Sequence, residues 1–430
     1  MDKNNGAIYD ARKLGKPKMI ILGVQHMFAM FGATILVPIL TGLDISTTLL
    51  MAGLGTLLFH CITKFKVPAF LGSSFAFLGG YAAIKAFSPN DPNSMLPYAC
   101  LGVACAGLIY FILAAVIKAV GIEKVMRFFP PVVTGPIIIA IGLGLAPSAV
   151  SNCTTNWFLA VVALAVIVVF NIWGKGMAKI IPIILGLLIS YGTGLVLYFI
   201  SQANPDLIQN VPWLFSGGAD ANGVYQPIFD FTSLNTICDN ISKGHIFGSE
   251  GLIGIPIHWD KTVFGGIDYS NGALIASSII AIVPIAFATM MEHIGDICAI
   301  SSTTGNNYIK DPGLHRTLVG DGLATTLASL FGGPANTTYG ENTGVLALTR
   351  VYDPRVIRIA AYFAVAVSFF PIVSVIIGSI PSCIIGGISF VLYGMISAIG
   401  VRNVVENKVD FTKSRNLIVA AVILVCALGL

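Results

Sequence analysis

The chain has 430 residues, of which 56% are hydrophobic and only 10% are charged, and its net charge is +4. A soluble domain carries about 25% charged residues, so this composition excludes an ordinary soluble protein. Apolar runs of the roughly 20 residues that a spanning helix needs recur along the whole chain. The sequence therefore predicts an all-α polytopic membrane protein, and it lacks the alternating segments of about ten residues that build a transmembrane barrel.

The apolar runs are separated by short polar segments and by one long polar stretch. This stretch, 202–270, is rich in Gly, Asn and Asp and is predicted to be a loop outside the membrane. The predicted spans, two of them short, are 18–41, 45–63, 68–86, 96–117, 130–150, 156–174, 180–201, 271–298, 317–333, 338–350, 355–379, 383–401 and 415–430.

The basic residues predict the orientation of the chain. With the polar tail 1–17 in the cytoplasm, all but three of the 24 Lys and Arg residues fall on the cytoplasmic side. The three exceptions are Lys85, Lys243 and Lys261. Because cytoplasmic loops are enriched in Lys and Arg, this bias supports the number of spans, a cytoplasmic N-terminus and an extracellular 202–270 loop. We expect a multi-pass protein of a bacterial plasma membrane.

The two short spans resemble each other. VPAFLGSSFAF at 67–77 and GPANTTYGENT at 333–343 align from Pro68 and Pro334, and each passes Gly and Ser or Thr residues before a helical run. Short, Gly- and Pro-interrupted spans in corresponding halves indicate the binding site of an inverted-repeat transporter. We expect each to form a short strand, with the two strands paired at mid-membrane and the following helix N-termini directed at the centre. The alternative is that Pro and Gly are simply common in membrane helices.

Four acidic residues fall inside predicted spans, and three of them are candidates for chemistry. A carboxylate at mid-bilayer is costly, so such residues usually face a cavity and have a function. Glu292 and Asp296 are spaced by four residues and share a helix face, which favours a pair that takes up and releases protons. Glu341 lies within the second broken span, 338–350, whereas Asp321 is expected near a membrane face. The alternative is a polar clamp that only holds helices together.

The residue types around the broken spans favour a small planar ligand with C=O and N–H groups. Backbone amides near Phe75 and Gly340 can donate to carbonyl oxygens, and helix N-termini strengthen such sites. Glu292 and Glu341 can accept hydrogen bonds from N–H groups. Phe75 or Tyr339 can stack on a flat ring. A pyrimidine base has all of these features.

Other patterns do not indicate catalysis or a metal. His26 and His293 lie within spans, where a buried neutral His bonded to a neighbouring helix is the commoner role. Glu292 and His293 do not form H-E-x-x-H, and the eight Cys residues show no C-x-x-C spacing. We therefore expect no metal, no cofactor and no nucleic-acid partner, and the absence of a nucleophile–base pair argues against an intramembrane enzyme.

ENTGVLALTR at 341–350 resembles the signature of the nucleobase–ascorbate transporter family, also called nucleobase:cation symporter 2. The signature has an acid, Gln or Pro, then Asn-x-Gly and, four residues further, Thr-Arg. QHMFAMFGATILVPIL (25–40), EHIGD (292–296) and DPGLHR (311–316) are also similar, so the resemblance covers essentially the whole chain. Glu341 at the first signature position resembles the uracil permease branch, because purine members usually have Gln there and ascorbate members Pro.

The resemblance implies two inverted repeats of seven spans, in which a core domain (18–128 and 271–380) carries substrate against a gate domain (129–201 and 381–430). It implies uracil import by proton symport and a homodimer formed largely by the gate domains. The residues that it implies for substrate binding are Ala33, Phe75, Glu292, Tyr339, Gly340 and Glu341, with Ser389 and Tyr393 on the gate side. It further implies Glu292 and Asp296 for proton coupling, and His26 and Asn342 as supporting residues.

Two features depart from the family pattern. Asp296 stands where bacterial uracil members can have His, and the thirteenth run ends at Leu430, so we expect the gate domain to lack its last span. Two alternatives remain: a xanthine or purine permease of the same fold, and an anion transporter or channel of the same inverted-repeat plan. Glu341 argues against the first alternative, and the negative charges of Glu292 and Glu341 argue against the second.

Overall fold

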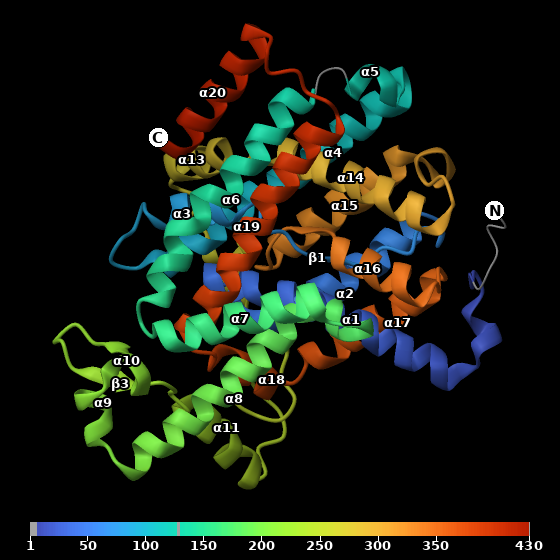
Figure 1. Cartoon of the computed structure of the whole chain (residues 1–430). Helices are drawn as coiled ribbons and strands as arrows, with labels where there is room; N and C mark the ends of the chain where they lie inside the picture. The colour runs from blue at the N-terminus through green and yellow to red at the C-terminus, as the bar shows by residue number, and fades with distance from the viewer. Residues whose placement is uncertain (1–6, 127–129, 430) are drawn as a thin grey trace. The chain divides into compact units, whose positions relative to one another are not determined.

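The computed structural model describes residues 7–126 and 130–429. Each predicted span corresponds there to a helix, to a broken helix pair, or to a short strand followed by a helix (Figure 1). Within these ranges, seven helical stretches, one of which comprises α13 and α14, are long and apolar enough to cross a membrane, or up to eight if one bent pair counts as a single span. The remaining predicted spans form shorter helices, and in two of them, 68–86 and 338–350, a short strand precedes the helix, as predicted.

The chain forms two compact units. The first comprises Met1–Phe128 and Lys243–Ser374, and the second comprises Phe129–Ser242 and Val375–Leu430. The main elements of the first unit are η1 (Ala11–Leu14), α1 (Lys16–Thr41), α2 (Ile45–Ile62), β1 (Leu71–Ser73), α3 (Leu78–Lys85), α4 (Leu96–Val120), α5 (Ile122–Met126), α12 (Val263–Gly266), α13 (Gly272–Ile282), α14 (Ile285–Thr304), the π-helical turn η5 (Ile309–Gly313), α15 (Leu314–Leu330), β4 (Asn336–Thr338), α16 (Gly340–Thr349) and α17 (Pro354–Ser368).

The second unit contains three long helices and most of the polar 202–270 segment. The described structure of that segment includes four short α-helices, α9 to α12, and a two-stranded sheet. The main elements of the unit are α6 (Pro131–Cys153), α7 (Trp157–Trp173), α8 (Pro182–Ala203), α9 (Asp206–Asn210), α10 (Pro212–Phe215), β2 (Ser216–Ala219), β3 (Tyr225–Pro227), α11 (Thr232–Ser242), α19 (Ser382–Glu406) and α20 (Ser414–Gly429), while α18 (Pro371–Gly378) runs across the boundary of the two units.

Small residues let the helices of the first unit approach closely. A Cβ atom on Gly107 of α4 would lie 2.8 Å from the carbonyl oxygen of Gly322 in α15. Thr326 Oγ1, one turn further along α15, donates to Ala104 O at 3.1 Å. These pairs show that α4 and α15 run antiparallel, with the end of α4 next to the start of α15. Glycine and threonine at such contacts are typical of helix packing in membranes.

Two predicted spans are interrupted where proline removes a backbone donor. The predicted span 271–298 is divided into α13 and α14 next to Pro284, and α14 continues to Thr304. The predicted span 355–379 consists of α17 and α18, which meet at an angle of 87° before Pro371. Proline cannot donate the helical hydrogen bond and clashes with the preceding turn, which explains both breaks.

Part of the predicted polar tail is packed against the first unit. We call residues 7–15 the N-terminal strap. Ile8 N donates to Arg350 O at 2.8 Å, and Tyr352 N donates to Ile8 O at 2.8 Å. Tyr9 Oη donates to Thr304 O at the end of α14, at 2.7 Å. The strap therefore joins the end of α14 to the segment between α16 and α17.

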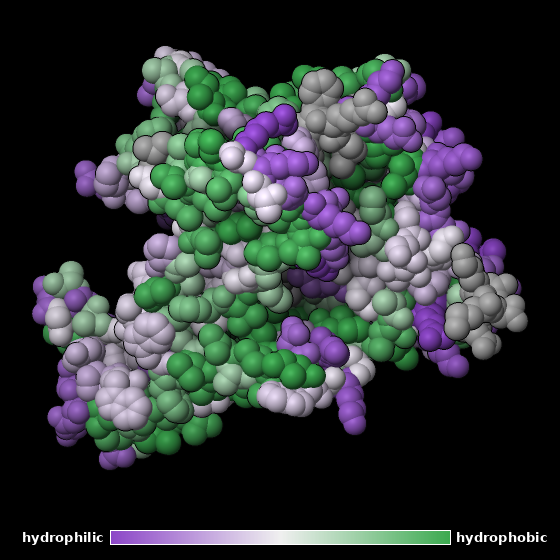
Figure 2. Space-filling model, turned by 45° about the horizontal axis from the view of Figure 1, so that its top comes forward, coloured by the Kyte–Doolittle hydropathy of each residue, from purple (hydrophilic) through white to green (hydrophobic). Residues whose placement is uncertain are grey.

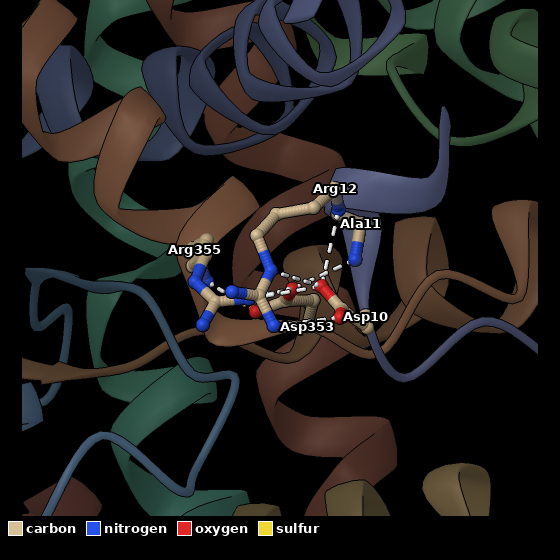
Figure 3. A network of polar contacts seen from close by, with 5 residues as sticks. All are labelled: Asp10, Ala11, Arg12, Asp353 and Arg355. Carbon is tan, nitrogen blue, oxygen red and sulfur yellow. Dashed lines mark hydrogen bonds and ion pairs between the residues drawn. The ribbon is translucent and has the colours of Figure 1, made fainter. Parts of the chain in front are cut away.

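Charged groups hold the strap in place (Figure 3). Ala11 N donates to Asp353 Oδ2 at 2.7 Å, and Arg355 Nη1 reaches both Asp10 and Asp353, at 3.0 and 3.2 Å. Arg12 forms two further hydrogen bonds to the Asp10 carboxylate. Asp353 also caps α17 by accepting from Arg355 N. The same carboxylate thus stabilises the start of a helix and the contact with the strap.

Apolar side chains cover large parts of the visible surface (Figure 2), as a lipid-exposed protein requires. Hydrophilic side chains gather in separate patches between them. Many large exposed side chains are aliphatic, among them Ile112 on α4, which is 61% exposed, and Val196 on α8, which is 59% exposed. Such exposure would be unfavourable in water and is expected in a bilayer.

Candidate functional site

The two broken spans meet in a two-stranded antiparallel sheet. Leu71 of β1 pairs with Thr338 of β4, and Ser73 pairs with Asn336. Backbone hydrogen bonds extend the ladder at both ends, from Ser74 N to Ala335 O at 2.8 Å and from Tyr339 N to Phe70 O at 3.1 Å. The strand pairing predicted from the two proline-led segments is therefore confirmed.

Side chains of neighbouring helices satisfy the strand backbone. Thr56 Oγ1 of α2 donates to Leu71 O at 3.1 Å and accepts from Leu71 N at 2.9 Å. Thr325 Oγ1 of α15 donates to Asn336 O at 2.6 Å, while Asn336 Nδ2 donates to Met51 O at 2.9 Å. Non-helical backbone at membrane depth is tolerated only where the protein or water satisfies it. These hydroxyl and amide groups make the two short strands possible.

A helix begins shortly after each strand. α3 starts at Leu78, and α16 starts at Gly340, two residues after β4. Neither helix has a side-chain hydrogen bond that caps its N-terminus in the described residues. The first backbone N–H groups of a helix lack internal partners and carry partial positive charge. The sheet therefore places two helix N-termini that can donate to the oxygen atoms of a ligand.

Tyr339 is held inside the protein. Its hydroxyl donates to Ser73 O at 2.8 Å and accepts from Thr34 Oγ1 at 3.3 Å. Its ring packs on Gly72, where a Cβ atom would lie 2.5 Å from Tyr339 Cε2. Because only 5% of the Tyr339 surface is exposed, its main contribution is to fix β1 against β4. Phe75, by contrast, is half-buried.

Three carboxyl groups gather beside the start of α16. Glu292 on α14 is exposed, while Asp296 on α14 and Glu341 in the first turn of α16 are half-buried. Glu292 and Asp296 lie one turn apart on the same side of α14, and Glu341 directly follows Gly340. Gly340 is exposed as well, and a Cβ atom there would lie 3.9 Å from Asp296 Oδ1. The structure thus brings the predicted acids together with the predicted backbone donor.

A buried chain of polar groups continues from Asp296. Thr338 Oγ1 donates to Asp296 Oδ2 at 2.9 Å and lies 3.4 Å from His293 Nδ1. His293 Nδ1 lies in turn 3.5 Å from Asp321 Oδ2, and both of these side chains are fully buried. Asp321, which was expected near a membrane face, is fully buried in the structure. Because α15 begins at Leu314, Asp321 is two turns inside the helix and packs against α14.

His26 and Asn342 lie in contact and join α1 to α16. Asn342 Nδ2 is 3.3 Å from His26 Nδ1 and 3.3 Å from His26 O. Both side chains are buried. This contact places the residue that follows Glu341 against a neighbouring helix, which orients the first turn of α16.

Three of the implied residues are not part of this geometry. Ala33 lies in α1, but its side chain falls outside the described part of the structure. Ser389 and Tyr393 are buried one turn apart on α19, in the second unit. Their roles stay expectations from the resemblance.

The sequence interpretation missed the hydroxyl groups that organise the site. The hydroxyl of Thr56 donates a hydrogen bond to strand β1, that of Thr34 donates to Tyr339, and that of Thr338 donates to Asp296. A signal was present, because a Thr beside a broken span can satisfy backbone that has left the helix. The site offers backbone donors, carboxylate acceptors and a ring, and in the described residues no group of three or more His, Cys, Asp or Glu side chains could hold a metal.

Helices that surround two broken spans, with their strands paired, define a polytopic membrane transporter of the inverted-repeat type. The structure resembles the transmembrane domain of the cyanobacterium bicarbonate transporter BicA, with a TM-score of 0.65, 12% identity, and coverage of 98% of this chain and 97% of that one. It also resembles the murine anion transporter Slc26a9, with a TM-score of 0.51, 10% identity, and coverage of 100% and 70%. At such low identity these similarities establish the fold.

The chain belongs to the Permease family, whose model matches residues 17–430. It is 39% identical over 421 residues to the uracil permease of Bacillus caldolyticus, covering 95% of this chain and 85% of that protein. It is 38% identical over 423 residues to the uracil permease of Bacillus subtilis, again covering 95% and 85%. The putative pyrimidine permease RutG of Escherichia coli is 35% identical over 428 residues, with coverage of 99% and 86%. The resemblance to nucleobase transporters is confirmed, and the chain is a multi-pass transporter of the plasma membrane and not an enzyme.

Proposed function

We propose that this protein imports uracil together with a proton. The observation that carries the proposal is the gathering of Glu292, Asp296 and Glu341 around the uncapped start of α16, beside the β1–β4 pair. The relatives named uracil permease, which match almost the whole chain, support this choice of substrate. Glu341, rather than the Gln of purine members, favours uracil over xanthine.

Each polar edge of uracil has a complementary group in the proposed site. The carboxylate of Glu341 and the carbonyl oxygen of the protonated Glu292 carboxyl group accept from the ring N–H groups. The backbone N–H groups at the starts of α16, near Gly340, and of α3, near Phe75, donate to the two carbonyl oxygens. The half-buried ring of Phe75 stacks on the base. Tyr339 fixes β1 against β4 beside the site, and His26 and Asn342 orient α16.

Glu292 is the residue that we assign to proton coupling, with Asp296 as its partner. An ionised carboxylate in a site that closes off from water is costly. Protonation of Glu292 removes this cost. The core domain that carries uracil and a proton therefore moves across the membrane more readily than the empty core domain with an ionised Glu292. One charge moved through 100 mV gains about 2.3 kcal/mol, which is enough for an accumulation of about fiftyfold.

We further propose that the first unit is the core domain and the second unit the gate domain of an elevator-type transporter. The division of the chain near residues 128 and 374 supports this assignment. Ser389 and Tyr393 of α19 then line the gate side of the substrate path, and the gate domains form a homodimer. The bias of Lys and Arg supports a cytoplasmic N-terminus.

Two substitutions separate substrate binding from proton coupling. Glu292→Gln keeps a hydrogen-bonding side chain without a titratable proton, so we expect uracil to exchange across the membrane without pH-driven accumulation. Glu341→Ala removes an acceptor for the base and is expected to weaken uracil binding by roughly 2 kcal/mol, or about thirtyfold. Uptake and binding of labelled uracil in proteoliposomes measure both effects.

The matched control is Glu406→Gln, which neutralises an exposed carboxylate that pairs with Arg402. It should leave both binding and accumulation unchanged. Accumulation of uracil by Glu292→Gln at the wild-type level would refute the proton assignment, while unaltered uracil affinity in Glu341→Ala would refute the substrate site.

A further inference from the structure

The two-stranded sheet of the candidate site has two outer edges, one on β1 and one on β4. Backbone groups alternate in direction along a strand. Phe70 bonds to β4, so the N–H and C=O groups of Leu71 point toward the outer edge of β1. In the same way Ala335 bonds to β1, so the C=O group of Asn336 points toward the outer edge of β4. Buried backbone groups of this kind need partners from outside the sheet.

One threonine binds each outer edge. Thr56 and Thr325 lie on α2 and α15, the helices that precede β1 and β4, and both side chains are fully buried. Thr56 Oγ1 accepts from Leu71 N at 2.9 Å and donates to Leu71 O at 3.1 Å. Thr325 Oγ1 donates to Asn336 O at 2.6 Å. Each threonine therefore takes the place that a further strand would have in a larger sheet.

These edge contacts fix the direction in which each strand leaves the sheet. β1 leads to the start of α3, and β4 leads within two residues to the start of α16 at Gly340. Leu71 and Asn336 are both buried, so water cannot replace a hydroxyl group that is removed. A strand without its edge contact has buried backbone groups with no partner, which is costly, and it shifts to satisfy them. Such a shift moves the N-terminus of the following helix.

We propose that Thr56 and Thr325 are positioning residues, each of which controls the recognition of one carbonyl oxygen of uracil. This inference rests on the proposed function, in which the starts of α3 and α16 each donate to one of the two oxygens. Thr56 positions the donors of α3, and Thr325 positions those of α16. Both act through the strand backbone and not by contact with the base. Recognition of the two oxygens is thus divided between hydroxyl groups on two separate helices.

The test combines protein variants with uracil analogues. Calorimetry measures the binding of uracil, 2-thiouracil and 4-thiouracil to the purified full chain in detergent. Sulfur accepts hydrogen bonds more weakly than oxygen, so we expect the wild type to bind each analogue about tenfold more weakly than uracil. Thr56→Val and Thr325→Val should each bind uracil about tenfold more weakly. Each should also lose its discrimination against one analogue, and the analogue should differ between the two variants.

Further variants separate the hydroxyl groups from the stability of the helices. Thr56→Ser and Thr325→Ser keep the hydroxyl group and should restore both affinity and discrimination. If thermal unfolding shows that a valine variant is not folded, the cysteine variant at that position replaces it, because a thiol is a weak donor. The matched controls are Thr48→Val in α2 and Thr317→Val in α15, buried threonines whose hydroxyl groups donate to a carbonyl oxygen about one turn earlier in the chain. They should bind all three ligands as the wild type does.

The pattern of discrimination decides the outcome. Equal loss against both analogues in both valine variants would show a general loosening of the sheet and overturn the division between the two threonines. Unchanged discrimination in both variants, or serine variants that stay as weak as the valine variants, would overturn the positioning role. These results leave the proposed function intact if the wild type binds uracil and discriminates against the analogues. A wild type that binds xanthine in place of uracil would refute the proposed function, and this inference with it.

Discussion

Two adjacent threonines in β4 have opposite roles. Thr338 donates a hydrogen bond to Asp296 at 2.9 Å, whereas the buried Thr337 hydroxyl has no hydrogen-bond partner in the described residues. Removing a hydrogen bond to a charged group costs about 1.5–3 kcal/mol, while removing an unsatisfied polar group is neutral or stabilising. The pair therefore separates the orientation of Asp296 from the general stability of the strand.

We expect Thr338→Val to lower proton-driven uracil uptake by about tenfold, because a loss of roughly 1.4 kcal/mol in the orientation of Asp296 corresponds to that factor. Thr337→Val, the same change one residue earlier, should leave uptake and thermal stability unchanged or slightly raise the latter. Labelled uptake and unfolding temperature are the two measurements. If both variants lost uptake to the same extent, the strand as a whole and not the Thr338–Asp296 bond would be responsible.

The acids of the site could be predicted from the sequence, but their surroundings could not. Glu292, Asp296 and Glu341 stand out because carboxylates are rare in apolar spans. Asp321 stood out as well, yet its burial depends on where α15 begins and on the contact with His293, which no local pattern shows. The hydroxyls of Thr34 and Thr338 form hydrogen bonds with Tyr339 and Asp296, which are 305 and 42 residues away in the sequence. The sequence around a threonine does not indicate a hydrogen-bond partner so far along the chain.

At the scale of elements, the N-terminal strap holds together the ends of α14 and α16, the helices that carry Glu292 and Glu341. Its charged contacts make the strap sensitive to acid. The hydrogen bond from Arg12, followed by the charges of Arg12 and Arg355, holds the pKa of Asp10 well below its usual range. A carboxyl group whose pKa is lower in the folded than in the unfolded state stabilises the folded state at pH values above its unfolded pKa of about 3.9. This stabilisation is lost as the pH falls toward the pKa of the group in the folded state.

We therefore predict that Asp10→Asn lowers the unfolding temperature slightly at pH 7, and that wild type and variant converge as the pH falls below about 4. The effect is small because Asp10 and Arg12 are solvent-accessible. Thermal unfolding between pH 7 and pH 3 measures it. Asp239→Asn removes an exposed carboxyl that makes no ion pair in the described residues, and it should match the wild type throughout. A constant difference between wild type and Asp10→Asn across the pH range would contradict the electrostatic account.

The strap and the broken helices show which elements a sequence predicts. The strands β1 and β4 were predicted because Pro68 and Pro334 open two similar segments. The strap was predicted only as part of a polar tail, since its backbone pairs with Arg350 and Tyr352 from the far end of the first unit. Polar residues and long-range backbone pairing leave no periodic pattern. The helices α9 to α12 in the 202–270 segment were missed because they are short, between 4 and 11 residues long.

At the scale of the whole molecule, the apolar runs predicted the order of the helices, and the Permease family confirms the class of protein. The same fold occurs in the bicarbonate transporter BicA at 12% identity, so the fold leaves the substrate open. The substrate is proposed instead from the acids beside the start of α16 and from the relatives named uracil permease. Function therefore depends on a few residues in a widely shared architecture.

The central claim is proton-coupled import of uracil, and the most direct measurement is uptake of labelled uracil into proteoliposomes under an inward proton gradient. Uptake is measured with and without a protonophore, and with excess unlabelled uracil or xanthine as competitor. We predict accumulation that the protonophore abolishes and that uracil, but not xanthine, inhibits. Uptake that is independent of the gradient would contradict the coupling, and uptake of xanthine in place of uracil would contradict the assignment of Glu341.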